Sequence, residues 1–68
     1  MKLWKYTQKK VKVAFTDGDT MTGFVRDFVN QEDTENDYDE LSFIPEGEPE
    51  ITIGENEIKS IVVIEWST

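Results

Sequence analysis

The carboxylates are the main candidates for catalysis or ligand binding, because the sequence contains neither cysteine nor histidine. Without cysteine there is no thiolate catalysis, and without histidine the commonest general base is absent. Nearly all zinc sites are excluded as well, because they use these two residue types. Paired carboxylates could still act as general acid and base, as in glycosidases and aspartic proteases. A chain of 68 residues offers little room for the deep cleft that this chemistry needs. We therefore expect no enzyme, no catalytic residue and no cofactor.

The densest run of carboxylates covers residues 33–40, where side chains with oxygen ligands stand at every second position. An EF-hand calcium loop needs glycine at its sixth position and glutamate at its twelfth. Here Tyr38 and Ile44 stand at those positions. Specific calcium binding and weak divalent association are two hypotheses for this run. We predict the third, an acidic loop over residues 30–40 that is solvated and holds no metal.

The acidic loop and the aromatic residues near the chain ends are the predicted partner surface. Trp4, Trp66 and Tyr38 could stack on bases or contact a proline-rich peptide. The carboxylates favour a basic protein as partner. The residues of this candidate surface are Glu32, Asp33, Glu35, Asp37, Tyr38, Asp39, Trp4 and Trp66.

Charge is unevenly distributed along the chain. Fifteen acidic and seven basic residues give a net charge of −8, and five of the lysines lie among the first twelve residues. Contacts to a nucleic acid backbone come from clustered lysine and arginine, so this composition does not favour nucleic acid as the first partner. Two hypotheses remain: both charged regions are solvated surfaces, or the basic region of one copy joins the acidic region of another.

Five segments with alternating or unbroken apolar residues predict β-strands. The Asp-Gly pair at 17–18 predicts a hairpin turn, because glycine accepts the positive φ that such turns need. Gly23, inside the second strand, indicates a sharp bend or a close backbone approach. Phe15, Phe24 and Phe43 alternate with polar residues and are predicted to be core. The expected strands span residues 10–16, 20–29, 41–44, 51–53 and 58–65.

The last strand is apolar on both faces over residues 61–64, so one face can line the core while the other needs a cover. A neighbouring subunit or the N-terminal Leu3, Trp4 and Tyr6 could supply that cover. For residues 1–9, one or two helical turns and an extended lead-in are the two alternatives. A chain this short comes out near zero net stability by itself. We therefore expect a homo-oligomer.

Residues 10–65 resemble the Sm-like family of small SH3-like β-barrels, within one domain that covers residues 1–68. The likeness is closest to small Sm-like proteins of Gram-positive bacteria and their phages. It implies an all-β, five-stranded, strongly bent barrel. The residues that carry it are Val11-x-Val13-x-Phe15-x-Asp17-Gly18-Asp19, Gly23-Phe24-Val25 and Phe28, and later Ile51-x-Ile53 and Ile58-x-x-Ile61-x-Val63.

The resemblance also implies assembly into rings, in which the fourth strand of one subunit pairs with the fifth of the next. An exposed apolar strand with unpaired backbone groups is independently a template for another strand. The residues expected at this interface, or in the core behind it, are Ile51, Ile53, Ile61, Val62, Val63 and Ile64.

The RNA site of the family is not expected here. Val29 stands where the family has an aspartate, the late turn at 54–56 has no arginine, and Asn30 is the one remnant. The acidic loop would also repel phosphates. RNA binding through another surface, such as the lysine-rich N-terminal region, is the alternative function. A third hypothesis is a regulator that mimics the charge of nucleic acid.

The expected function is thus a non-catalytic oligomeric assembly or protein-interaction module. The longest unbroken apolar run has four residues, which is too short for a signal peptide or a membrane span. A cytoplasmic protein without a membrane partner is the corresponding expectation.

Overall fold

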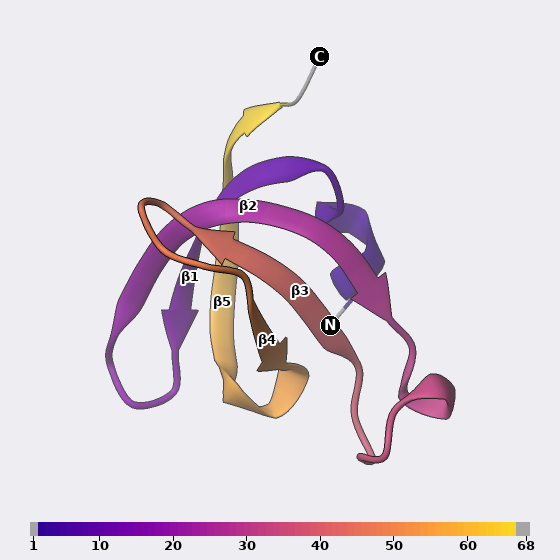
Figure 1. Cartoon of the computed structure of the whole chain (residues 1–68). Helices are drawn as coiled ribbons and strands as arrows, with labels where there is room; N and C mark the ends of the chain where they lie inside the picture. The colour runs from indigo at the N-terminus through magenta and orange to yellow at the C-terminus, as the bar shows by residue number, and fades with distance from the viewer. Residues whose placement is uncertain (1, 67–68) are drawn as a thin grey trace.

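The computed structural model describes residues 2–66, with side chains as far as Ile64, and five antiparallel strands in this part of the chain form one sheet. The all-β class is confirmed, and each strand lies within one residue of its predicted bounds. Their order in the sheet is β4-β3-β2-β1-β5 (Figure 1). The strands are β1 (Lys9–Phe15), β2 (Thr20–Val29), β3 (Glu40–Pro45), β4 (Ile51–Gly54) and β5 (Ile58–Trp66).

Three short 3₁₀ turns join the strands or precede them: η1 (Leu3–Tyr6), η2 (Gln31–Asp33) and η3 (Glu55–Glu57). Within residues 2–66, no helix is long and apolar enough to cross a bilayer. Of the two alternatives for the N-terminus, the structure has the helical one, as the single turn η1. Leu3 is fully buried, and Tyr6 packs against the core. The Gln8 N–H donates to the Val25 carbonyl over 2.7 Å, which ties this lead-in to β2.

The long strand β2 arches over the molecule (Figure 1), and two local features allow the bend. At Gly23, an added Cβ would run into the Ile44 carbonyl oxygen, so the predicted close backbone approach is confirmed. Further along, Val25 pairs with Phe43 and Asp27 with Ser42, which leaves Arg26 as the extra residue of a β-bulge. A bulge increases twist and bends its strand.

The core lies inside the curve of the sheet. Val25 and Phe28 both point inward although they are three residues apart, because the bulge shifts the alternation between them. Phe43 is fully buried and Phe15 packs against the core, as predicted. The prediction for Phe24 was wrong: it is half-buried on the outer face, between Lys10 and Ile44 in the cross-strand register. The buried core consists of Leu3, Val11, Val13, Val25, Leu41, Phe43, Ile53 and Ile58.

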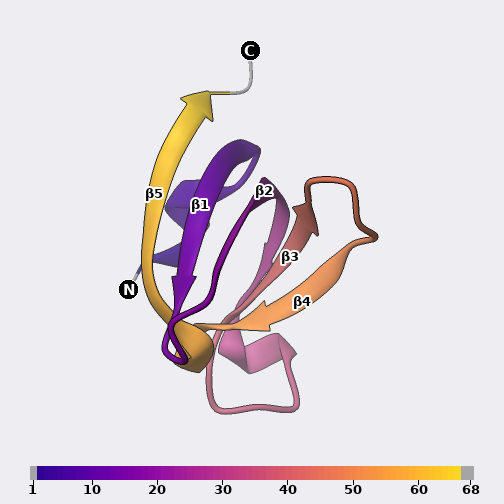
Figure 2. The same cartoon turned by 90° about the vertical axis from the view of Figure 1, so that its left-hand side faces the viewer.

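The expectation of a barrel is corrected by the sheet, which does not close. β4 and β5 are its two outer strands and have no ladder between them. Only the three residues of η3 separate them, and Figure 2 shows both strands leaving this junction on opposite sides of the molecule. Strands that diverge in this way lie farther apart than the spacing of about 4.8 Å that a ladder needs. Each therefore keeps one edge without a strand partner in the described sheet.

Candidate functional site

The outer face of β5 carries exposed apolar side chains, as the sequence predicted for this strand. Val62 is 59% exposed and Ile64 is 52% exposed. Val62 lies opposite Lys12 of β1 on this face, while Ile61 and Val63 lie opposite the buried Val13 and Val11. Ile61 and Val63 are accordingly half-buried and pack against the core. The strand thus has one face in the core and one face uncovered.

The β5 ladder with β1 is regular only in its middle. Bulges at Lys59 and Ile64 interrupt the register at both ends and leave Ser60–Val63 evenly paired with Val11–Ala14. Bulges commonly mark places where pairing with a further strand is discouraged. The regular stretch of β5 is therefore the part of its free edge best suited to accept another strand.

The β4 edge presents less apolar surface. Ile51 is 37% exposed, but Ile53 is 1% exposed and belongs to the core. Gly54 is also buried, and the Tyr38 ring lies where a Cβ on Gly54 would stand. The six residues predicted for the interface therefore divide into exposed Ile51, Val62 and Ile64, half-buried Ile61 and Val63, and buried Ile53.

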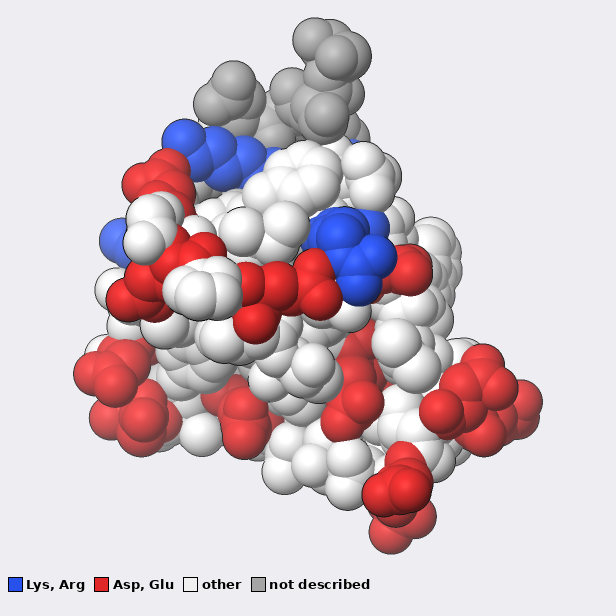
Figure 3. All heavy atoms as spheres, viewed as in Figure 1, with Lys and Arg blue, Asp and Glu red and all other residues white. Residues whose placement is uncertain are grey.

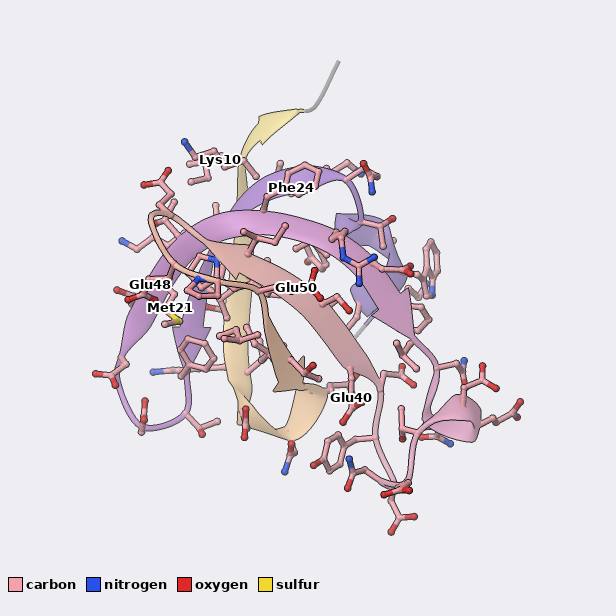
Figure 4. The ribbon with its side chains drawn as sticks, in the orientation of Figure 1. Lys10, Met21, Phe24, Glu40, Glu48 and Glu50 are labelled. Atoms are coloured by element: carbon pink, nitrogen blue, oxygen red, sulfur yellow. The ribbon has the colours of Figure 1, made fainter. Side chains whose placement is uncertain are left out.

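Two ion pairs hold the turn that leads into β4. Arg26 binds Glu50 through both carboxylate oxygens, and the Lys10 Nζ lies 2.7 Å from Glu46 Oε1. The hydrogen bond from Arg26 lowers the pKa of Glu50, and the same bond raises the pKa of Arg26. Figure 4 shows Glu50 under the arch of β2 and Glu48 near Met21, at the first half of β2. Each end of the turn thus carries one exposed ion pair, and Glu48 and Pro49 at its tip are exposed.

Most residues of the acidic loop are exposed, and several hydrogen bonds shape its backbone. Its Asn30 side chain accepts the Glu32 N–H over 3.0 Å, and the Asp39 carboxylate accepts the Gln31 N–H over 2.7 Å. The Asp39 carbonyl accepts the Glu55 N–H, which links the loop to η3. In the part of the chain that the structure describes, no three of its acidic residues are arranged to hold a metal ion. Asn30, the one residue that the predicted resemblance would match to an RNA site, is engaged in this local hydrogen bond.

The predicted partner surface is not one continuous patch. The carboxylates of Glu32, Asp33, Glu35 and Asp37 are exposed, and Figure 3 shows acidic side chains gathered at the corner formed by this loop. Tyr38 is half-buried, with its ring beside Gly54. Trp4 is on a different part of the molecule, in η1. The Trp66 side chain lies outside the described residues.

Trp4 borders a groove that sequence reasoning missed. The ring is 54% exposed, and the Lys5 Nζ lies 6.0 Å from its centroid. The groove has a volume of about 470 Å³ and is lined by Trp4, Lys5, Tyr6, Lys9 and Val63. The signal in the sequence was the alternation of aromatic and basic residues from Trp4 to Tyr6. It could not show that Val63, from the other end of the chain, completes the groove.

Comparisons with known proteins return no match. No family model matches the chain, and neither a curated protein nor a solved structure is significantly similar to it. The function therefore has to be argued from the geometry of the sheet edges, the charged turn and the groove.

Proposed function

We propose that this protein is an Sm-like, non-catalytic assembly module whose copies join edge to edge, with β4 of one copy against β5 of the next. The observation that carries this proposal is a single sheet with two free edges, one of which bears Val62 and Ile64 exposed on its outer face. Free backbone groups beside apolar side chains favour the addition of a strand.

The Sm-like assignment is supported by the bend of β2 and by the identity of the outer strands. β2 has an interior glycine where the backbone of β3 approaches closely. β4 and β5 are the two strands that rings of the Sm-like family join. A head-to-tail contact of this kind uses different surfaces on the two copies and can close into a ring.

The chain length supports assembly for an energetic reason. A domain of about 60 residues buries only about 60% of the surface that its unfolded chain exposes. Covering Val62 and Ile64 removes further apolar area from water, and each buried Å² contributes about 25 cal/mol. The exposed carboxylates of the acidic loop would remain outside this contact, available to a basic protein partner.

The decisive variant is Val62→Glu, because Val62 faces solvent while Val63 faces the core. Multi-angle light scattering over a concentration series should show a discrete multimer for the wild type and a monomer for the variant. Circular dichroism should be unchanged. Thr16→Glu is the matched control, since Thr16 is exposed in the β1–β2 turn. A wild type that stays monomeric at high concentration, or a Val62→Glu protein with unchanged mass, would overturn the proposal.

RNA binding through the lysine-rich N-terminal region is a second candidate function, favoured by the two aromatic and two basic residues around the Trp4 groove. Electrostatic binding is strongest at low salt, so the protein is titrated with single-stranded oligonucleotides at low salt. Binding that weakens with added salt and with Lys5→Glu supports this candidate. The absence of binding at low salt excludes it.

A further inference from the structure

We infer that the Trp4 groove receives the Glu48–Pro49 tip of the turn before β4 in a neighbouring copy. This inference rests on the proposed edge-to-edge assembly and adds a second contact to it. It makes the groove and the turn two halves of one interface.

Strand lengths are the first argument. β4 has four residues, and the regular stretch of β5, Ser60–Val63, also has four. If β4 of the next copy pairs antiparallel with that stretch, its first residue, Ile51, lies beside Val63. The residues that precede Ile51 are then carried past the C-terminal end of the stretch. Val63 is also a wall of the groove, so the tip of the turn arrives beside it.

The turn is preformed for such a contact. The ion pairs of Glu46 with Lys10 and of Glu50 with Arg26 hold its two ends within its own copy. Gly47 has φ +74°, a conformation that glycine adopts without strain. Glu48 and Pro49 between these anchors are exposed. A segment fixed before binding loses little conformational entropy when it docks.

Chemical complementarity is the second argument. The groove offers the Trp4 and Tyr6 rings as an apolar surface and the Lys5 ammonium as a cation. Among residues 2–64, neither Lys5 nor Glu48 has an ion-pair partner in its own copy. Pro49 and the exposed Ile51 supply apolar surface, and Glu48 supplies the carboxylate. The acidic loop is a poorer occupant, because its residues 32–37 include no apolar side chain.

The two possible pairing directions give the Glu48 carboxylate different partners. An antiparallel arrangement brings Glu48 of the next copy to Lys5. A parallel arrangement would instead bring Glu48 of the next copy close to Lys59 at the start of β5. The segment beside the groove would then be η3 of the next copy. The two arrangements therefore predict different partners for one carboxylate, which a charge-swap experiment can separate.

Charge reversal tests the inference on the full chain. Lys5→Glu and Glu48→Lys should each weaken self-association about fivefold, as measured by sedimentation, because each replaces an attraction by a repulsion. The double variant Lys5→Glu/Glu48→Lys should restore association to within about twofold of the wild type. The matched control Lys59→Glu/Glu48→Lys has the same net charge and should not be restored.

A second measurement uses the absence of cysteine from the chain. Lys5→Cys protein mixed with Glu48→Cys protein should form a disulfide-linked dimer on mild oxidation, whereas Lys5→Cys mixed with Glu35→Cys should not.

Four outcomes overturn the inference: single reversals that leave association unchanged, rescue by Lys59→Glu in place of Lys5→Glu, equal cross-linking of both mixtures, and oligonucleotide binding at low salt that Lys5→Glu abolishes. If Val62→Glu also leaves the mass of the wild-type multimer unchanged, the proposed assembly itself fails. If one of the four outcomes is found but Val62→Glu dissociates the multimer, the groove contact is wrong and the proposed assembly stands.

Discussion

The two outer strands of the sheet are held in place in different ways. β4 is short, but two of its four residues are buried, and an exposed ion pair joins Glu50, just before its start, to Arg26 of β2. β5 is more than twice as long and is bound to the sheet on one side by β1, with exposed apolar side chains on its outer face. Tertiary contacts outside the ladder stabilise β4, whereas β5 depends on its ladder and its inward side chains. β5 thus exposes more apolar surface than β4 in a single copy.

The largest expected effect separates a core residue of β4 from a surface residue of β5. Ile53→Ala should lower the free energy of unfolding by about 2–5 kcal/mol, because it leaves a cavity in the core. Val62→Ala should change it by less than about 0.5 kcal/mol, because Val62 is mostly exposed in a single copy. Urea unfolding at a concentration where the protein is monomeric measures both. Equal losses for the two variants would contradict the different roles assigned to the strands.

A smaller effect is expected from Gly54→Ala at the end of β4. The new Cβ would meet the Tyr38 ring and, at 2.7 Å, Asn56 Oδ1. Overpacking of this kind costs about 1–3 kcal/mol. In a Tyr38→Ala background the same substitution should cost less, and a double-mutant cycle from urea unfolding measures the coupling. Additive losses would show that Tyr38 does not anchor β4.

The smallest effect concerns the ion pair that fixes the start of β4. The pKa of Glu50 is lowered in the folded protein, so the pair stabilises the fold at pH values above the ordinary pKa of glutamate, about 4.3. That contribution is lost as the pH falls through the lowered pKa of Glu50. Arg26 stays protonated throughout. Because both groups are exposed, Glu50→Gln should cause only a small loss of stability at pH 7.

The free energies of unfolding of wild type and Glu50→Gln should therefore converge in an acid series. Glu48→Gln is the control, because this carboxylate lies in the same turn without an ion-pair partner among residues 2–64. A constant difference between wild type and Glu50→Gln from pH 7 down to acid pH would show that the ion pair does not hold β4.

Much of the fold could be predicted because the signals are local. Alternation of apolar residues marks strands wherever it occurs, and glycine marks positive φ or a close approach. Gly18 has φ +97°, and Gly23 lies where the backbone of β3 leaves no room for a Cβ. Phe24 was misassigned because a bulge two residues later changes which face each side chain takes. Alternation alone does not reveal where an extra residue enters a ladder.

The candidate site was predicted only in part. The exposure of Val62 and Ile64 follows from an apolar run that is too dense for one buried face, and the sequence shows such a run directly. The Trp4 groove and the ion pair between Arg26 and Glu50 could not be predicted in this way. Val63 is 59 residues from Trp4, and Glu50 is 24 residues from Arg26. No local pattern couples residues so far apart in the chain.

The sequence by itself determined the five strands, the turn at Asp17–Gly18 and the excess of negative charge, because each depends on neighbouring residues or on composition. Only the tertiary structure decided that β4 and β5 stay apart, that Tyr38 covers Gly54, and that Lys5 and Val63 share one groove. These features arise where the bent sheet brings distant residues together. That meeting depends on the position of each bulge and on the short η3 connection, neither of which the apolar alternation of the sequence encodes.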